Sequence, residues 1–326
     1  MCYARRLVKN RFLSVLLTLA VVLPAQAGLQ HRSSSAKVNG LVEALPLERS
    51  PQNHLMVRAF INGKPALFTV DTGAPVSAIA VQRREFFGLK SIAEGGEIPT
   101  RLNVNGAFNN VVTAKTLRLG SLNLLDEPLV AIDLRGRPRA RVKGLDEPAI
   151  DGILGADILF PTKAVVDCDK QLLFLKMDPS APAGMPGINT RGFGRVPMHV
   201  SSGYNLYVDG MVNGRAAKLM VDTGAFATLL HSDFVRSMRI PVRRSPFTSS
   251  GVNLSERRVQ LATIANLSIG SVDMQGKEVG VIDMTGLIHG GLLAGKPPVV
   301  GLLGSEILRR NHGIIDFGTN TLYLKR

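Results

Sequence analysis

Short apolar runs, each ended by glycine, asparagine or proline, recur along most of this chain. The runs are rich in valine, isoleucine and leucine, and aromatic residues are few. Apolar runs of roughly four to eight residues between turn-forming residues are typical of strands, because helices need longer periodic segments. The pattern therefore predicts an all-β chain, with brief helices only around 156–160 and 305–310.

The same pattern occurs twice. Three blocks of the first half recur in the second half in the same order: 54–79 with 205–230, 116–133 with 266–283, and 152–176 with 301–325. A repeat of this length is too long for a solenoid unit, so it indicates two homologous domains. A chain of about 300 residues can bury a core in each of them. An Asn-Gly pair in each first block, Asn62-Gly63 and Asn213-Gly214, predicts a tight hairpin.

The N-terminus has a different pattern. Basic residues precede an apolar run at 12–23, which is followed by Ala25-Gln26-Ala27. These are the three parts of a secretory signal peptide, so we expect cleavage after Ala27 and a periplasmic or secreted protein. An uncleaved membrane anchor is the alternative, although the run is shorter than the ~20 residues of a membrane-spanning helix. We expect no stable membrane span after cleavage.

These observations divide the chain into five parts. They are a signal peptide at 1–27, a linker, N-terminal strand or short pro-segment at 28–50, a first lobe at 51–178, an interlobe linker at 179–200, and a second lobe at 201–326. Cleavage would leave a single cysteine, Cys168, so the mature chain can form no internal disulfide. Its stability must therefore come from burial of apolar surface.

The chain is basic, with a formal net charge of +14. Such a charge suits acidic partners or an anionic surface. We predict no binding to nucleic acid, because no recognised binding motif or aromatic-studded basic stretch is present. The densest basic stretch, 135–143, is either a solvated loop, a rim that steers substrate, or a site of proteolytic processing. The six histidines show no metal-ligand spacing, and no HExxH or CxxC occurs, so neither a metal nor a cofactor is predicted.

In each copy an apolar run ends in Asp-Thr-Gly. Two carboxylates that face each other across a symmetry axis can share one proton. The ionised group then acts as general base on a water, and the protonated group donates to the scissile carbonyl oxygen. Asp71 and Asp222 are therefore the candidate catalytic pair, and the sequence leaves open which of them holds the proton. Neighbouring hydroxyls can hydrogen-bond across the pair and neighbouring glycines suit a tight turn; these supporting residues are Thr72, Gly73, Thr223 and Gly224.

With these motifs the chain resembles aspartic proteases of the pepsin/retropepsin clan over residues 50–326. Each Asp-Thr-Gly is followed at a matched distance by an apolar-apolar-Gly motif, 153–155 and 302–304, which braces the aspartate loop in that clan. Alanine follows both glycines where pepsin-like enzymes favour serine, and Ser77 and Thr228 match the hydroxyl usual in retropepsins. The resemblance implies a bacterial-type, secreted, single-chain duplicated retropepsin-like enzyme. Its two homologous β-barrel lobes would be related by a pseudo-twofold axis within a monomer.

The function implied is that of an aspartic endopeptidase acting on peptide or protein substrates. We expect a mildly acidic optimum, because the alanines at 74 and 225 cannot donate the hydrogen bond with which a serine lowers the pKa of an aspartate. The alternatives are a non-catalytic peptide-binding protein of the same fold and a processing protease restricted to one envelope substrate. Flaps over the cleft are expected at Asn105-Gly106 and at Ser250-Gly251, or these are ordinary surface hairpins.

Overall fold

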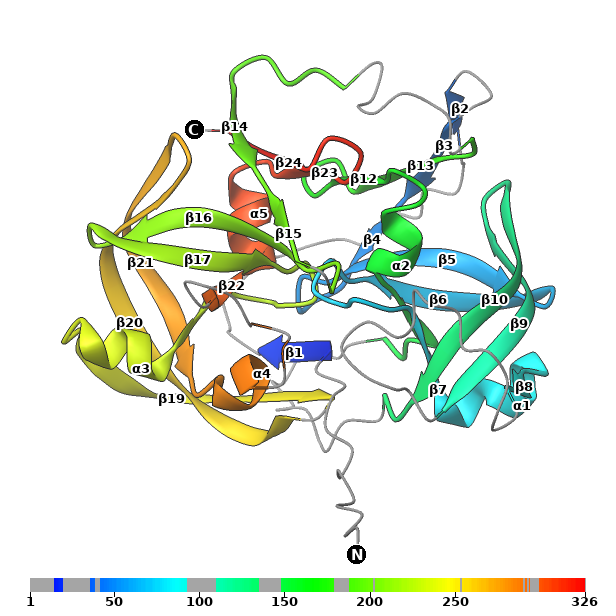
Figure 1. The fold of residues 1–326 in the computed structure, drawn as a ribbon, viewed down its shortest axis with the longest axis horizontal. Coiled ribbons are helices and arrows are strands. Elements are labelled where there is room, and N and C mark those ends of the chain that lie inside the picture. The colour runs from blue at the N-terminus through cyan, green and yellow to red at the C-terminus, as the bar shows by residue number, and fades with distance from the viewer. Residues whose placement is uncertain are drawn as a thin grey trace, which may run out of the picture.

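The structure of the chain is a computed structural model. It describes residues 15–19, 36–38, 42–92, 110–134, 148–178, 188–201, 203–252, 254–289, 291, 293 and 299–325. Figure 1 shows two similar β-structures side by side, one from each half of the chain, with further strands lying above them. The two halves of the sequence have thus folded into two lobes.

Six strands of the first half close into a barrel. In order around the barrel they are β5 (Leu55–Ile61), β6 (Lys64–Val70), β11 (Gly152–Leu154), β7 (Ala78–Ala80), β10 (Leu122–Ile132) and β9 (Val111–Leu119), and β9 pairs back with β5. Short strands extend this sheet at either side, namely β4 (Glu48–Arg49) on β5 and β8 (Lys90–Ser91) on β9. A 3-10 turn, η1 (Val81–Arg83), and helix α1 (Arg84–Phe87) follow β7.

Six strands of the second half close in the same order. They are β16 (Leu206–Val212), β17 (Arg215–Val221), β22 (Val299–Leu303), β18 (Leu229–His231), β21 (Val272–Ile282) and β20 (Leu254–Ile269), and β20 pairs back with β16. The sheet continues through β15 (His199–Val200) on β16, and through β19 (Val242–Val252) and then β1 (Val15–Leu19) beyond β20. Helices α3 (Ser232–Ser237) and α4 (Thr285–His289) lie between strands of this lobe.

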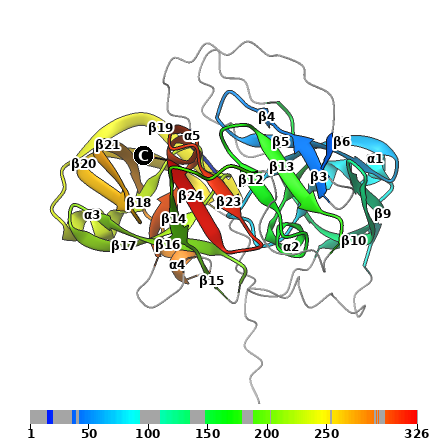
Figure 2. The same ribbon diagram turned by 90° about the horizontal axis from the view of Figure 1, so that it is seen from above.

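A third sheet contains strands of both halves. Its order is β14 (Phe193–Pro197), β24 (Thr321–Lys325), β23 (Ile314–Asp316), β12 (Val165–Asp167), β13 (Leu172–Lys176), β3 (Val42–Pro46) and β2 (Ala36–Val38). Strands β12 and β23 occupy matching places in the repeat and pair antiparallel at its centre, with Val166 opposite Ile315. Figure 2 shows these central strands lying across the middle of the molecule. Main-chain hydrogen bonds between these two matching strands thus join the two halves of the chain.

The predicted hairpins form where the sequence places them. Asn62 and Gly63 have φ values of 50° and 79°, and Asn213 and Gly214 have 48° and 79°. Two consecutive positive φ angles are the requirement of the two-residue turn that matches strand twist, and Asn-Gly adopts them most readily. The hairpins β5–β6 and β16–β17 therefore bring both aspartates to the end of a strand with a fixed register.

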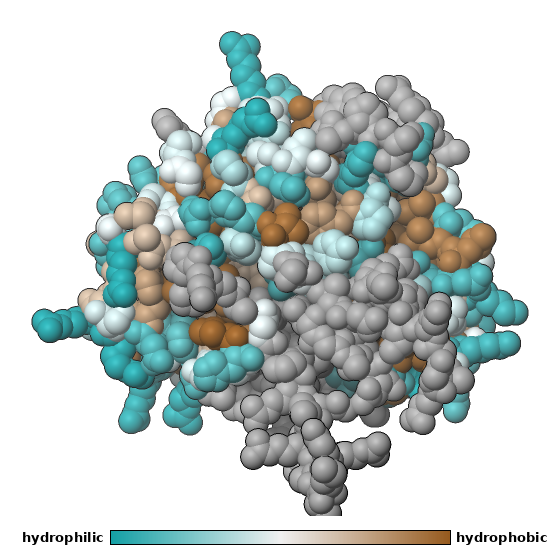
Figure 3. All heavy atoms as spheres, viewed as in Figure 1, coloured by the Kyte–Doolittle hydropathy of each residue, from teal (hydrophilic) through white to brown (hydrophobic). Residues whose placement is uncertain are grey.

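The largest cluster of buried apolar side chains extends through both lobes, and two smaller clusters lie beside it. One apolar cluster contains residues of both barrels and of the third sheet, among them Phe68, Leu219 and Ile315. On the face seen in Figure 3, apolar residues form small separate groups among hydrophilic ones. Cys168 is buried within the apolar cluster as a free thiol.

The prediction of an all-β chain with few short helices is confirmed. Helices follow both apolar-apolar-Gly motifs, as α2 (Ala156–Leu159) and α5 (Ser305–Arg310). The stretches treated as linkers contain strands, since 28–50 holds β2, β3 and β4 and 179–200 holds β14 and β15. Among the described residues no helix has the length and apolar character needed to span a membrane.

Candidate active site

Each aspartate of the repeat stands at the end of a barrel strand that has a parallel partner. The backbone N–H of Asp71, after β6, donates to the carbonyl of Leu154 at 3.0 Å, and that of Asp222, after β17, donates to Leu303 at 3.1 Å. The register places Leu154 beside Val70 and Leu303 beside Val221. The apolar-apolar-Gly strands β11 and β22 thus hold the first residue of each Asp-Thr-Gly loop.

The two threonines lock the loops together. The hydroxyl of Thr72 donates to the carbonyl of Val221 at 2.8 Å, and that of Thr223 donates to Val70 at 2.7 Å. Each hydroxyl also accepts the backbone N–H of the other threonine at 3.1 Å. Both residues are almost fully buried. Four hydrogen bonds therefore cross between the lobes at one point, shielded from water.

The two glycines let the carboxyl groups approach each other. A Cβ on Gly73 would lie 2.7 Å from Cγ of Asp222, and one on Gly224 would lie 2.5 Å from Cγ of Asp71. No side chain fits at that distance, so each carboxyl group is packed against the backbone of the opposite loop. The same glycines donate their N–H groups to Oδ1 of their own aspartates, at 2.9 Å in the first loop and 2.8 Å in the second.

Burial and proximity hold the pair in a protonated form to higher pH than usual. Asp71 and Asp222 are 1% and 5% exposed. Burial and the charge of Asp222 raise the pKa of Asp71 well above its ordinary value, and the N–H of Gly73 opposes the rise. Burial also raises the pKa of Asp222, but the N–H of Gly224 and a hydrogen bond from Asp71 oppose it. The pair has unequal surroundings despite the matching motifs.

One source of this inequality is a residue that the sequence reasoning did not select. Ser50 and His54 close a buried turn, in which the N–H of Ser50 donates to the carbonyl of His54 at 2.9 Å. Ser201 and Asn205 close the matching turn of the second lobe at 3.0 Å. The charge of His54 lowers the pKa of Asp222, and the second lobe has an asparagine at that place. The gapless alignment of the first repeat blocks, which pairs His54 with Asn205, could have revealed the difference.

Two further acids, Asp157 and Glu306, were also missed. They occupy the same position in the third repeat blocks, two residues after the bracing glycines. Both carboxyl groups are buried. The signal in the sequence was an acid at a matched place in each copy, inside a segment that otherwise reads as apolar.

The flap predictions fall partly outside the described residues, where Asn105 and Gly106 lie. Ser250 and Gly251 lie in β19, which forms a hairpin with β20, and Gly251 is paired with Leu254 at the turn. The basic stretch 135–143 also lies outside the described residues. In the part of the chain that is described, no group of His, Cys, Asp or Glu side chains could hold a metal ion.

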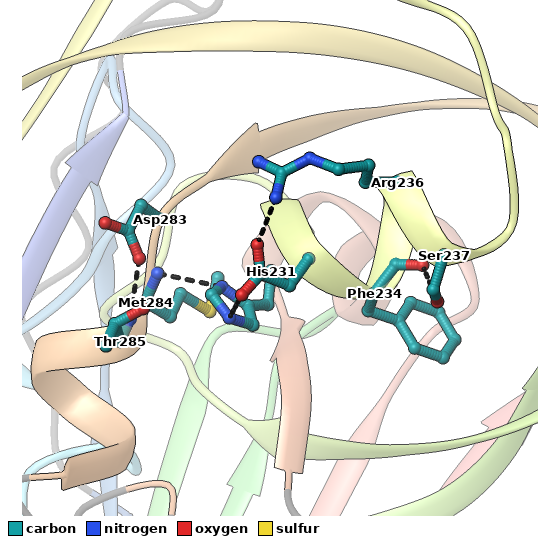
Figure 4. A network of polar contacts seen from close by, with 8 residues as sticks. His231, Phe234, Arg236, Ser237, Asp283, Met284 and Thr285 are labelled. Atoms are coloured by element: carbon teal, nitrogen blue, oxygen red, sulfur yellow. Dashed lines mark hydrogen bonds and ion pairs between the residues drawn. The ribbon is translucent and has the colours of Figure 1, made fainter.

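In the second lobe a polar network joins the end of β18 to the start of α4 (Figure 4). The N–H of Met284 donates to Nδ1 of His231 at 3.0 Å, and Nε2 of His231 lies 3.5 Å from Asp233. The bond fixes the end of β18 to the start of α4, whose Leu287 is buried in one apolar cluster with Ala225. The first lobe has an alanine at the position of this histidine.

Comparison with known proteins gives a match to one family and similarity to several solved structures. A family model described as "Aspartyl protease" matches residues 57–158 and 208–307. No curated protein sequence matches the chain. Among solved structures, basic 7S globulin from soybean is 8% identical over 87% of this chain and 95% of its own, with a TM-score of 0.46.

Two further solved structures are similar to the chain. The aspartic proteinase from Irpex lacteus is 13% identical over 87% of this chain and 97% of its own, with a TM-score of 0.44. A retropepsin-like aspartic protease from Rickettsia conorii is 19% identical over 40% of this chain and 90% of its own, with a TM-score of 0.28. The family model matches once in each lobe, in agreement with the internal repeat.

Proposed function

The chain belongs to the aspartyl protease family, and from that premise we propose that it is an endopeptidase whose catalytic groups are Asp71 and Asp222. The observation that carries the proposal is the pair of buried carboxyl groups, each packed against the glycine of the opposite loop. This arrangement supplies the two things that water-mediated peptide hydrolysis needs, a general base and a general acid at the same place.

Oδ1 of Asp222 accepts the N–H groups of Gly224 and Ala225 at 2.8 and 3.1 Å, and Oδ1 of Asp71 accepts that of Gly73 at 2.9 Å. Because hydrogen bonds from N–H groups favour the ionised form, we assign the charge to Asp222 and the shared proton to Asp71. Asp222 is ionised and takes a proton from the water as the water oxygen attacks the scissile carbonyl carbon. Asp71 gives its proton to the carbonyl oxygen in the same step.

The resulting tetrahedral diol then breaks down. Asp222 passes its newly gained proton to the departing amine as the carbon–nitrogen bond breaks, and Asp71 recovers a proton from a diol hydroxyl. The pair returns to its starting state. Every proton moves between substrate, water and the two carboxyl groups.

An extended peptide is the substrate that suits the surrounding strands. The β19–β20 hairpin of the second lobe serves as a flap, with Ser250 and Gly251 near its tip. The outer edge of β19 accepts an antiparallel strand, since Val15–Leu19 pairs along it. Main-chain hydrogen bonds to such an edge bind an extended segment without regard to its side chains.

We further propose a mildly acidic optimum. Ala74 and Ala225 have no hydroxyl to stabilise an ionised carboxylate, and burial raises the pKa of both aspartates. One of the two must ionise for the water to be activated, so the acidic limb of the activity profile follows the lower pKa of the pair.

The location, subunit state and domain limits belong to the same proposal. Cleavage after Ala27 would release the protein into the periplasm or the medium. A monomer is sufficient, because one chain supplies both aspartates. The lobes comprise 51–178 and 201–326, with 179–200 between them, although the strands within 28–50 and 179–200 contribute to the third sheet.

Cleavage of a mixed peptide library from pH 3 to 8 tests the proposal, with mature wild-type protein beside Asp71→Asn and Asp222→Asn. Asp167→Asn is the matched control, because this buried aspartate accepts backbone N–H groups in the third sheet. We expect cleavage by the wild type and the control, and none by the dyad variants. Activity that persists in either dyad variant overturns the assignment.

A wild-type protein that cleaves nothing in the library would point to one of the two alternatives. A non-catalytic peptide-binding protein would bind library peptides as tightly with Asp222→Asn as without it. A processing protease restricted to one envelope substrate would leave the library intact and would cleave a protein in an envelope extract, in a manner that depends on Asp71.

A further inference from the structure

Each lobe carries a buried acid in the first turn of the helix that follows its bracing strand. Asp157 lies in α2 and is 2% exposed. Glu306 lies in α5, and its Oε2 is buried although the residue as a whole is only half-buried. A carboxyl group is seldom buried unless it is hydrogen-bonded, so the partners of these two acids indicate what they do.

In the first lobe the acid holds the serine that lies six residues after Asp71. Both the hydroxyl and the backbone N–H of Ser77 donate to Oδ1 of Asp157, at 2.6 and 2.9 Å. The Ser77 hydroxyl in turn accepts the N–H of Gly155 at 2.9 Å. The hydroxyl is therefore oriented by the carboxyl group and used to hold the bracing glycine.

The second lobe repeats the arrangement with different residues. The hydroxyl of Thr228 accepts the N–H of Gly304 at 3.1 Å. Burial raises the pKa of Glu306, and hydrogen bonds from the side chain and backbone of Thr228 oppose the rise. Thr228 and Glu306 occupy the places in the repeat that Ser77 and Asp157 occupy in the first lobe, so we infer the same relation between them.

These bonds continue directly to the dyad. Gly155 follows Leu154, whose carbonyl accepts the N–H of Asp71, and the residue before Gly304 accepts the N–H of Asp222. No side chain fits at the bracing glycines, because a Cβ on Gly155 would lie 2.6 Å from the backbone of Val76 and one on Gly304 would lie 2.3 Å from that of Ala227. In the first lobe, hydrogen bonds and the peptide group between Leu154 and Gly155 therefore link Asp157 to Asp71. In the second lobe the peptide group between Leu303 and Gly304 links Thr228 to Asp222 in the same way.

The residue after each bracing glycine forms a further hydrogen bond to the Asp-Thr-Gly loop of the same lobe. The N–H of Ala156 donates to the carbonyl of Ala74 at 2.8 Å, and that of Ser305 donates to Ala225 at 2.8 Å. Ser305 also donates its hydroxyl to the carbonyl of Thr223 at 2.9 Å. Both ends of each Asp-Thr-Gly loop are thus attached to the segment that carries the acid.

We propose that Asp157 and Glu306 are positioning residues for the dyad. Through the hydroxyls of Ser77 and Thr228 they fix the bracing strands, and so the separation and orientation of the two catalytic carboxyl groups. The role rests on the proposed peptidase function. Because displacement of a catalytic group by about 1 Å can cost on the order of 100-fold in rate, loss of either acid acts on turnover more than on substrate binding.

Four variants and two controls test the proposal. Asp157→Ala and Glu306→Ala remove the acceptor, whereas Asp157→Asn and Glu306→Gln keep an acceptor oxygen. The controls are Asp167→Ala and Asp316→Ala. These two buried aspartates also occupy matched places in the repeat and accept backbone N–H groups, at 2.8 to 3.1 Å, but they lie in the third sheet.

We expect each alanine variant at Asp157 or Glu306 to lower kcat by about 10- to 100-fold with KM within about twofold. The amide variants should recover most of that loss, and the controls should keep the wild-type kcat while folded. Wild-type kcat in the alanine variants, or an equal fall in the controls, overturns the proposal. Thermal unfolding of every variant shows the temperature range in which the comparison holds.

Hydrogen exchange separates this proposal from the function on which it rests. Backbone exchange at 71–74 and 222–225 should accelerate at least tenfold in the alanine variant of the same lobe, and not in the controls. Unchanged exchange at these loops refutes the positioning role even in an active enzyme. A wild-type protein without peptidase activity refutes the function, and the exchange result then still decides whether the acids hold the loops.

Discussion

Replacement of Thr72 by valine should destabilise the whole molecule, because its hydroxyl serves both lobes. The side chain donates to the carbonyl of Val221 at 2.8 Å and accepts the N–H of Thr223 at 3.1 Å. Valine is similar in shape, so the change removes both bonds with little loss of packing. It leaves a carbonyl and an N–H without partners in a region that is almost fully buried.

The magnitude follows from those two groups. A buried polar group left unsatisfied costs about 1–3 kcal/mol, so the substitution should cost roughly 2–6 kcal/mol. That is a large part of the 5–15 kcal/mol by which a typical protein is stable. The matched control is Thr162→Val, which removes a buried hydroxyl bonded to the carbonyl of Ile158 at 2.7 Å within one lobe. The carbonyl of Ile158 also accepts the N–H of residue 162, so the control should cost only about 1 kcal/mol.

Guanidinium unfolding at neutral pH measures the difference. The midpoint should fall much further for Thr72→Val than for Thr162→Val, with the same slope for both. A second variant, Thr223→Val, should behave like the first, and the double variant should cost less than the sum, because either change alone already loosens the junction. If Thr72→Val lies within about 0.5 kcal/mol of its control, the hydroxyl does not hold the lobes together.

Four further outcomes follow from the site. Burial raises the pKa of Asp71 and of Asp222. The stability that their protonated forms contribute is therefore full below the unfolded pKa of about 3.9 and is lost as the pH rises through the folded pKa. Asp71→Asn should raise the melting temperature at pH 7 and leave it unchanged near pH 3. His54→Asn removes a charge that lowers the pKa of Asp222, so the acidic limb of the activity profile should move to higher pH. Gly73→Ala places a Cβ 2.7 Å from Cγ of Asp222 and should lower kcat/KM by at least about 100-fold, measured on a folded variant. Burial raises the pKa of Cys168 to about 12, so a thiol reagent at pH 8 should label it only after unfolding.

The parts of the fold that the sequence predicts are those governed by local chemistry. Asn62-Gly63 specifies its turn through two backbone angles, and the apolar run before Asp71 specifies a strand end. Because the sequence is repeated, the same turn and the same strand end are predicted again in the second half of the chain. Asp167 and Asp316 occupy matched places in the third repeat blocks, and both accept N–H groups of the residues that follow them.

What the sequence could not provide depends on contacts between distant segments. The pairing of β12 with β23, which joins the two halves, involves three residues on each strand and no turn that specifies it. The partners of Asp157 lie about 80 residues away along the chain, and a buried carboxylate cannot be told from an exposed one by its neighbours in sequence. His54 lowers the pKa of Asp222, which belongs to the opposite lobe. The residues around His54 in the sequence do not show that the two side chains interact.

The link between His231 and Met284, for which the first lobe has Ala80 in place of the histidine, has a consequence for the direction in which the proposed enzyme would bind a peptide. A peptide has a direction, from its amino end to its carboxyl end. A site built from two identical subunits has twofold symmetry, so it presents the same groups to a peptide bound in either direction. Here a histidine fixes the start of α4 beside one aspartate loop, and an alanine occupies the matching place beside the other. The surroundings of the two aspartate loops are therefore distinguishable, so under the proposed function a peptide bound in one direction would meet different side chains from the same peptide reversed.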